Sequence, residues 1–326
     1  MLDRPALSIL TAVVLLLPAL RAHAADSKIS GIMFGDYYAV LSADDTEVAL
    51  PEKQNAFQLR RVYFTYDRPV SDRFDVRVRF EANDAGFGSG TKMTPFVKHA
   101  YLKWKGALGG DLYIGESGTP TWAVSEGVWG YRSVEKTIMD LNGIGSSADV
   151  GLALQGRAGG ASYHVMVANG PGQRPGRDNG KKLYASVQLQ PGESNQLELY
   201  GDFDMLPGGD SFTLKALLGH SGDGFQGGIE TFARIDQEGA VTDPGEDVTR
   251  VGLSAFGSLP VADSWRGFAR LDVLNNDDVD TTDLVIIAGL DWAADKDVHI
   301  MPNLYVQLPD GPDPHIQARV TGLFKF

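Results

Sequence analysis

The sequence predicts an all-β fold, a transmembrane antiparallel β-barrel of about 16 strands with a long third loop folded into the lumen. Three observations support this. Segments that alternate apolar and polar residues recur along the chain, short and long connections take turns between them, and the apolar faces carry aromatic residues at two depths. In "FDVRVRFEAN" (74–83), every second residue from Phe74 to Ala82 is apolar. A period of two is typical of a β-strand with one apolar and one polar face.

The first residues are expected to be a leader rather than part of the fold. Arg4 gives a short positive region, residues 6–20 are apolar, and "AHA" at 22–24 is a small-residue cleavage site. This pattern predicts a cleaved signal peptide at 1–24 and a barrel domain at 25–326. The alternative is a membrane-anchoring helix, but the apolar run is short and contains a proline. No later stretch approaches the roughly 18 apolar residues of a membrane helix.

Composition excludes several classes of protein. The chain has no cysteine, which weighs against a small secreted scaffold held by disulfides. The formal net charge is −13, and it becomes −14 once the leader with Arg4, Arg21 and Asp3 is removed. A chain this acidic lacks the basic surface that nucleic-acid binding needs, so no nucleic-acid partner is expected.

Sixteen segments after the leader fit the strand pattern. Most are about 8 to 13 residues long, close to the roughly 9 to 11 that a tilted membrane strand needs. No linker or shift of composition divides them, so we expect one domain. The predicted strands are 28–41, 56–70, 73–83, 95–105, 111–117, 149–158, 161–169, 182–190, 195–204, 211–220, 225–236, 248–258, 264–274, 283–293, 298–308 and 314–326.

The connections between these segments alternate in length. Short ones such as "PVSDR" and "GALGG" take turns with long ones such as "LSADDTEVALPEKQN" and "NGPGQRPGRDNGK", although "DMLPGGD" and "PDGPD" break the rule. Outer-membrane barrels have tight turns at the periplasmic rim and longer loops at the extracellular rim. A soluble β-sandwich is the alternative, but it has no reason to place long loops at every second connection.

Aromatic residues on the apolar faces fall at two depths if odd strands rise from the periplasmic rim. Such belts are typical of the two interfaces of a membrane barrel, and the alternative is aromatic packing at the strand ends of a core. The extracellular set is Phe80, Phe96, Phe203 and Phe212. The periplasmic girdle is predicted to be Tyr66, Phe74, Trp104, Phe225, Trp265, Trp292, Phe324 and Phe326.

The opposite faces of the strands carry charge, as at Arg77 and Arg79 or Arg266 and Arg270. Burying so many charges in a dry core is prohibitive, so we expect a water-filled lumen.

Some strands depart from the pattern. "FQLRRVYFTYD" changes phase around Arg60 and Arg61, which predicts a bulge. Lys98 and Glu116 fall on the apolar face, and Pro302 lies inside a strand.

The third long connection, residues 118–149, is the longest. Its segment "SVEKTIMDL" predicts a short helix with Ser133 as N-cap and Val134, Ile138 and Leu141 on one face. A loop with its own apolar face must pack against something, and in a wide barrel the available surface is the interior wall.

Taken together, these features resemble a Gram-negative outer-membrane porin. The final strand, "HIQARVTGLFKF", ends at Phe326 and is similar to the last strand of that class. The arginine-rich "QLRRVYF" and "VRVRF" are more weakly similar to the phosphate-selective porins O and P. The resemblance implies an outer-membrane location, contact with lipid and lipopolysaccharide, recognition of Phe326 by the barrel-assembly machinery, and a homotrimer.

The resemblance also implies a function, the passive diffusion of small hydrophilic solutes or ions through a pore narrowed by the third loop. Pore radius and facing charges would select the solutes, without a chemical step, cofactor or metal. Residues 120–145 would form the constriction, which implies that its loop charges are Glu126, Arg132, Glu135, Lys136 and Asp140. They would face the wall residues Arg77, Arg79, Arg266, Arg270 and Arg319.

Other motifs do not carry a function. "GDGFQG" (222–227) joins two strands and reads as a hairpin turn rather than a nucleotide site. The histidines lack metal-ligand spacing. The loop acids in "DDVDTTD" read as solvated, with divalent bridging to lipopolysaccharide as the alternative. Three rival functions remain open: a barrel enzyme, a plugged structural or adhesive barrel, and a soluble periplasmic β protein.

Overall fold

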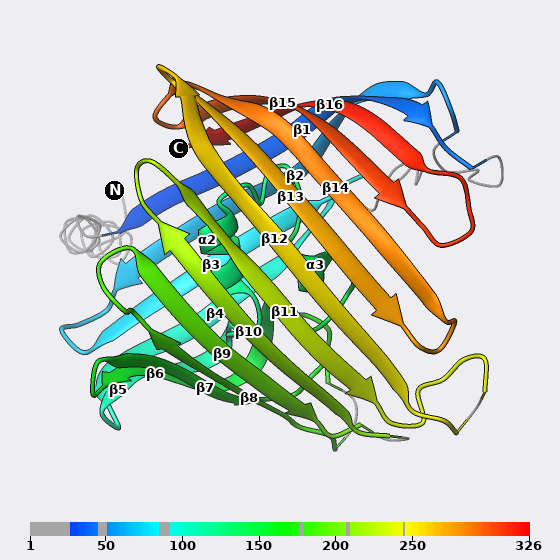
Figure 1. Cartoon of the computed structure of the whole chain (residues 1–326). Helices are drawn as coiled ribbons and strands as arrows, with labels where there is room; N and C mark the ends of the chain where they lie inside the picture. The colour runs from blue at the N-terminus through cyan, green and yellow to red at the C-terminus, as the bar shows by residue number, and fades with distance from the viewer. Residues whose placement is uncertain (1–26, 45–50, 85–91, 177–178, 207–208, 244) are drawn as a thin grey trace, which may run out of the picture.

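The computed structural model describes residues 27–44, 51–84, 92–176, 179–206, 209–243 and 245–326. The predicted leader, residues 1–24, lies outside this range. Sixteen strands form one closed antiparallel barrel, in which each strand pairs with its neighbour in sequence and β1 pairs with β16 (Figure 1). Closure leaves no strand edge with unpaired backbone groups. The predicted strand number and fold class are confirmed.

The strands lie close to the predicted segments, with β12 and β14 longer than expected. In the first half of the barrel they are β1 Lys28–Ser42, β2 Asn55–Pro69, β3 Phe74–Asn83, β4 Thr94–Ala107, β5 Gly110–Gly118, β6 Ala148–Ala158, β7 Ala161–Ala168 and β8 Lys182–Leu189. In the second half they are β9 Asn195–Asp204, β10 Ser211–Ser221, β11 Gln226–Asp236, β12 Val248–Ala262, β13 Trp265–Asn276, β14 Thr281–Asp295, β15 Val298–Leu308 and β16 His315–Lys325.

The barrel has an apolar outside and a polar inside, as one pair of neighbouring positions illustrates. Leu218 faces Ile229 across β10 and β11, and these side chains are 61% and 52% exposed. One residue further on, Leu217 faces Glu230, and both are 0% exposed. An apolar outer surface that extends around a whole barrel fits hydrocarbon rather than water. Among the described residues, no helix is long and apolar enough to cross a membrane.

The two rims differ in their connections, so we call them the short-turn rim and the long-loop rim. Outward aromatic residues gather at both. At the short-turn rim Trp265 stacks on Trp292 with ring centroids 5.9 Å apart, and Phe74 lies 5.6 Å from Trp104. Both are cross-strand pairs on the outer face.

Phe96 was expected on the outer face at the long-loop rim, and that expectation is wrong. Phe96 is the cross-strand partner of Glu81, whose side chain points into the barrel. The cause is a register shift between β3 and β4 that leaves Lys98 without a partner opposite it. The same shift turns Lys98 inward, where its ammonium lies 2.8 Å from Glu81. Glu116 stays on the outer face, opposite the exposed Val150.

Two other irregular positions are explained by strand pairing. The bulge predicted at Arg60 and Arg61 is confirmed, because the register with β1 skips Arg60. Both arginines therefore point into the barrel, although they are consecutive in sequence. Pro302 pairs with Val320 on β16, whereas the ladder between β14 and β15 is interrupted beside it, so its missing N–H costs no bond there.

The third loop enters the barrel, as predicted from its apolar residues. It contains α2 (Ala123–Trp129) and α3 (Ile138–Leu141), which lie inside the ring of strands (Figure 1). The predicted N-cap is wrong, because α3 begins after Thr137 rather than after Ser133. The carbonyl of Ser133 accepts a hydrogen bond from Arg60 on the barrel wall.

The chain end completes the barrel at Gly31. The N–H of Gly31 donates to the carbonyl of Phe326 at 2.7 Å, and the N–H of Phe326 donates back at 3.0 Å. The ring of Phe326 also covers Gly31 so closely that a Cβ there would lie 2.1 Å from it. A side chain at position 31 must therefore displace the last aromatic ring.

We predict that Gly31→Val lowers the free energy of unfolding by about 1 kcal/mol, the low end of the cost of overpacking, because the exposed Phe326 ring can move aside. The measurement is urea unfolding in detergent together with heat-modifiable migration on gels. Gly224→Ala is the control, because a Cβ at Gly224 meets nothing within 4 Å. Equal stability of Gly31→Val and the native chain would show that the contact of the Phe326 ring with Gly31 does not stabilise the closed barrel.

Candidate functional site

The third loop packs firmly against one side of the barrel interior. Its residues Val128, Trp129, Tyr131 and Val134 form an apolar cluster with wall residues on β10 and β12–β15. A second cluster joins Trp122, Ile138, Met139 and Ile144 to wall residues on β6–β9 and β11. The loop therefore covers the wall from β6 to β15 and leaves β1–β4 on the other side.

Several charged side chains beneath the loop are buried in ion pairs. Lys215 and Glu198 are 2.7 Å apart with both side chains fully buried, and Lys215 also donates to the carbonyl of Thr121 at 2.7 Å. Arg270 pairs with Asp272 and donates to the carbonyl of Lys136 on the loop. A buried charge is tolerable when an opposite charge and further hydrogen bonds compensate for lost water.

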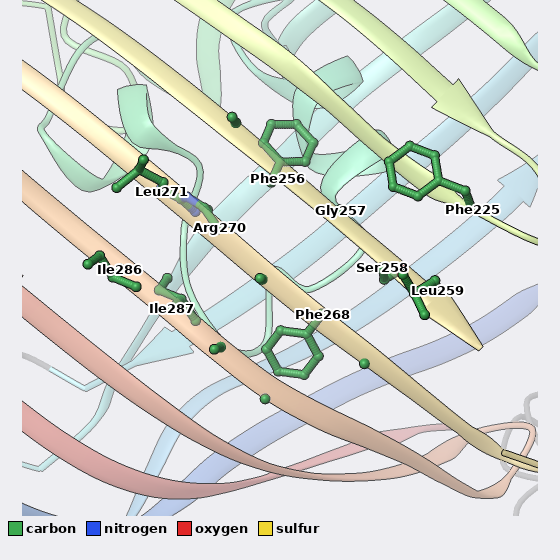
Figure 2. Close-up of a pocket in the computed structure, with 15 residues that line it drawn as sticks. Phe225, Phe256, Gly257, Ser258, Leu259, Phe268, Arg270, Leu271, Ile286 and Ile287 are labelled. Atoms are coloured by element: carbon green, nitrogen blue, oxygen red, sulfur yellow. The ribbon is translucent and has the colours of Figure 1, made fainter. Parts of the chain in front are cut away.

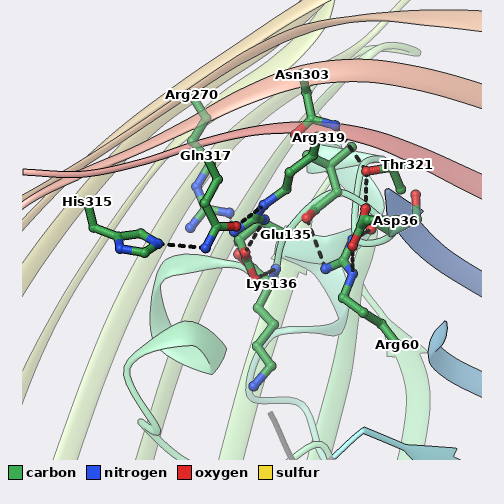
Figure 3. Close-up of polar contacts among 12 residues, drawn as sticks. Asp36, Arg60, Glu135, Lys136, Arg270, Asn303, His315, Gln317, Arg319 and Thr321 are labelled. Atoms are coloured by element: carbon green, nitrogen blue, oxygen red, sulfur yellow. Dashed lines mark hydrogen bonds and ion pairs between the residues drawn. The ribbon is translucent and has the colours of Figure 1, made fainter. Parts of the chain in front are cut away.

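Glu135 at the tip of the loop is the centre of a polar contact between the loop and β16. Its carboxylate lies 3.2 Å from the Arg319 guanidinium, which also donates to Gln317 (Figure 3). Arg60 reaches the same stretch of loop from β2 and pairs with Asp36. Burial alone would raise the pKa of Glu135, but the charges of Arg319 and Arg60 outweigh it and hold the pKa at about 2.

These contacts correct the expectation of a wholly water-filled lumen. Arg270 is 2% exposed and Arg319 is 6% exposed, so neither is a freely hydrated wall residue. Glu135 is also buried. The expectation took burial of so many charges to be prohibitive, but here each of these charges is paired beneath the loop.

Two cavities lie between the loop and the opposite wall. The Arg60 cavity is about 240 Å³, and its lining comprises Phe34, Gln58, Arg60, Arg61, Asn83, Asp84, Arg132, Glu135, Lys136 and Arg319. The Arg79 cavity is about 250 Å³, and its lining comprises Arg61, Tyr63, Arg79, Lys98, His99, Gly118, Thr119, Trp122, Ala123, Glu126, Arg132, Asp140 and Ser147. Arg61 and Arg132 line both, so these two arginines stand where the cavities meet.

The loop charges facing these cavities largely neutralise one another. Arg132 lies 2.9 Å from Glu126 and 2.9 Å from Asp140. Lys136 approaches Asp140 more loosely, at 3.9 Å. Burial raises the pKa of Glu126 while Arg132 opposes the rise. On the wall, Glu81 is shared by Arg61 at 3.2 Å and Lys98 at 2.8 Å.

Arg77 and Arg79 differ although they share one face of β3. Arg77 makes two bonds to the Asp67 carboxylate, at 2.6 and 2.9 Å. Arg79 donates to the Thr65 hydroxyl at 2.8 Å and lies over the Tyr63 ring. Within the described part of the chain, no carboxylate lies within ion-pair distance of Arg79.

The structure divides the residues predicted for the constriction into three groups. Arg79, Glu126, Arg132 and Asp140 line the Arg79 cavity. Arg132 also lines the Arg60 cavity with Glu135, Lys136 and Arg319. The remaining three line neither cavity: Arg77, Arg266 and Arg270.

Arg266 lies at the short-turn end of β13. It donates to the carbonyl of Asp223 at 3.1 Å and to Ser258. It also lies beside Tyr131 of the third loop, but it lines neither of the two cavities.

Among the basic residues that line the cavities, sequence reasoning missed four: Arg60, Arg61, Lys98 and His99. Two features of the sequence could have revealed three of them: the change of phase at Arg60 and Arg61, and the position of Lys98 on the apolar face of its strand. Each marked a bulge, and a bulge turns an extra side chain to the inside.

A larger depression, about 730 Å³, lies on the outer wall over β12–β14 (Figure 2). Apolar side chains such as Phe225, Leu259, Leu271 and Ile286 surround it, with alanine and glycine between them. It is part of the apolar outer surface and offers no cluster of polar side chains for a solute.

A metal site and a nucleophilic catalytic site find little support among the described residues. These residues contain no group of three or more His, Cys, Asp or Glu side chains placed to hold a metal ion. An Asp–His contact does occur, at 2.9 Å between Asp291 and His299, near the short-turn rim. No Ser or Thr hydroxyl bonds to His299 in the part of the chain that the structure describes, so a nucleophile is missing there.

Comparison with solved structures places this architecture among known barrels. An anion-selective porin from Comamonas acidovorans superimposes with a TM-score of 0.66 at 13% identity, covering 92% of this chain and 99% of that one. The outer membrane channel DcaP of Acinetobacter baumannii gives 0.67 at 11% identity, covering 92% and 97%. The chain has a porin fold. At these identities the likeness shows the fold alone.

The porin fold is also shared with OmpT, an outer membrane protein of Vibrio cholerae, in a loop-deletion form (TM-score 0.64, 11% identity, 92% and 99% coverage). No protein-family model matches the sequence. No curated protein matches it either. The similar solved structures confirm the predicted resemblance to porins, and they do so through the fold rather than through the sequence.

We predict that the contact at Glu135 stabilises the folded loop above about pH 4.5 and weakens as the pH falls toward 2. The pKa of Glu135 is lower in the folded state, so its contribution is present above the unfolded pKa and lost on acidification. Glu135→Gln should lower the free energy of unfolding by about 2–3 kcal/mol at pH 7, and the difference should shrink near pH 2.

The measurement is denaturant unfolding in detergent at several pH values. Glu193→Gln is the matched control, because Glu193 is exposed in the turn between β8 and β9. A difference between native and Glu135→Gln protein that stays constant from pH 7 to 2 would contradict the assignment.

Proposed function

We propose that this protein is a diffusion channel of the Gram-negative outer membrane, through which small hydrophilic solutes or ions pass beside the third loop. The observation that carries the proposal is the pair of charged cavities between the loop and β1–β4, enclosed by a barrel with an apolar outside. Charged side chains from two walls line this space, and water or a small polar solute can occupy it.

The proposed path has no chemical step. Solutes would enter one cavity, pass Arg61 and Arg132 where the cavities meet, and leave through the other. Side-chain volume there would exclude large solutes. Because Arg132 is held by Glu126 and Asp140, its position is fixed from the loop side. The charges on the two walls would orient polar solutes and bias ion selectivity.

The proposal includes the surroundings of the barrel. Lipid and lipopolysaccharide would cover the outer face, and Phe326 would serve as the signal for the barrel-assembly machinery. A homotrimer is proposed as the assembled form. In support, one of the similar solved structures is a trimer form of OmpT from Vibrio cholerae.

A plugged, structural barrel is the second candidate, because the loop fills much of the interior and the two cavities are small. A plugged barrel would insert into membranes without conducting.

We expect refolded protein to give stable single-channel steps in a planar lipid bilayer, because water can occupy the charged cavities. Folding and insertion are checked by heat-modifiable gel migration and protease protection. Correctly folded, inserted protein that stays silent would favour the plugged barrel and end the diffusion proposal.

We further expect Arg132→Ala to raise single-channel conductance and to move the reversal potential in a salt gradient toward cation selectivity. The change removes side-chain volume where the cavities meet and frees Glu126 and Asp140. The control is Arg77→Gln combined with Asp67→Asn, which removes an ion pair that lines neither cavity and preserves net charge. If Arg132→Ala and the control conduct alike, the path does not pass Arg132.

A further inference from the structure

Arg79 is unusual among the cations that line the Arg79 cavity. Arg61 and Lys98 share Glu81, and Arg132 is bound by Glu126 and Asp140. Among the described residues, Arg79 donates through Nε to the Thr65 hydroxyl and lies over the Tyr63 ring, which leaves most of its guanidinium donors available. Within the described residues it is the cation of this cavity that has no carboxylate partner.

The charge balance of the cavity therefore favours an anion. Four cations line it: Arg61, Arg79, Lys98 and Arg132. Three carboxylates oppose them, those of Glu81, Glu126 and Asp140. Among these seven side chains the positive charges exceed the negative ones by one, whereas the formal net charge of the chain is −13. Inside a partly desolvated space such an excess attracts anions more strongly than in bulk water.

His99 provides a second, independent sign of a ligand. It is directly opposite Arg79 in the pairing of β3 with β4, so both side chains point to the inside. His99 lines the cavity and is only 9% exposed, yet its Nδ1 has no hydrogen-bond partner among the described residues. A buried ring nitrogen without a partner is costly, and a bound acceptor would satisfy it when Nδ1 carries a proton.

The shape and surroundings of Arg79 fit a carboxylate with a small apolar part. A guanidinium presents a planar fork that matches a carboxylate with two parallel hydrogen bonds. The Tyr63 ring lies under the guanidinium, 5.6 Å from it, and Ala123 on the loop adds an apolar surface. A volume of about 250 Å³ admits an organic acid of the size of one aromatic ring.

We propose that Arg79, together with His99, is a transient binding site for small organic carboxylates beside the third loop. The carboxylate occupies the place that an acidic side chain takes at every other cation of this cavity. This proposal rests on the proposed diffusion function, because the carboxylate would bind at Arg79 while it passes through the channel. Its binding chemistry can be tested without conduction.

The experiment uses benzoate as the probe and neutral benzamide as its size-matched comparison. Native protein, Arg79→Gln, and the control pair Arg77→Gln with Asp67→Asn are compared. Benzoate should reduce chloride current through native channels in a saturable way, and benzamide should not. Arg79→Gln should weaken the apparent affinity for benzoate by roughly tenfold or more, the loss expected for a charge-assisted bidentate contact.

Titration calorimetry of benzoate into the detergent-solubilised barrel measures the same site without current. Arg79→Lys is included because it keeps the charge but lacks the fork, so it should bind benzoate more weakly than native protein while folding normally. If Arg79→Gln does not fold, the lysine variant decides the question. Folding of each variant is checked by heat-modifiable gel migration.

The outcomes separate the two proposals. Channels that conduct but show no saturable effect of benzoate would overturn the carboxylate site and leave the diffusion function standing. A barrel that does not conduct but binds benzoate in an Arg79-dependent manner would overturn the diffusion function and support the carboxylate site. Equal weakening in Arg79→Gln and in the charge-neutral control, or equal binding of benzamide, would also overturn the site.

Discussion

The fold depends on one constraint, the need of a backbone surrounded by hydrocarbon to satisfy its own hydrogen bonds. The pairing of β1 with β16 meets it by closing the sheet. Closure then fixes which way every side chain points, because residues alternate between the two faces. The charged faces of sixteen strands are gathered into one interior, and the interior must then accommodate those charges.

The barrel interior accommodates its charged side chains in two ways, and the position of the third loop determines which way applies to each part of the wall. Beneath the loop, charges such as Lys215 and Glu198 are buried in ion pairs that fasten the loop to the wall. On the side of β1–β4, cations face cavities in which water or solute can take part. One half of the barrel therefore behaves as a packed core and the other as a candidate passage.

Small irregularities in the strands set the character of that passage. The bulge at Arg60 brings two consecutive arginines to the inside, and the register shift near Lys98 adds a further cation. Regular strands would have sent one residue of each consecutive pair to the lipid. Bulges of this kind re-aim side chains without changing the fold, so they concentrate charge where the loop leaves space.

The sequence by itself determined the strand number, the two faces and the insertion of the third loop, because a period of two and an apolar loop segment are local properties. It also indicated the bulge at Arg60 through a change of phase. Only the tertiary structure decided which charges meet. Arg77 and Arg79 look equivalent in sequence, but Asp67 lies within reach of one and not of the other. Ion pairing depends on register and loop placement, and these are fixed only when strands distant in sequence come together.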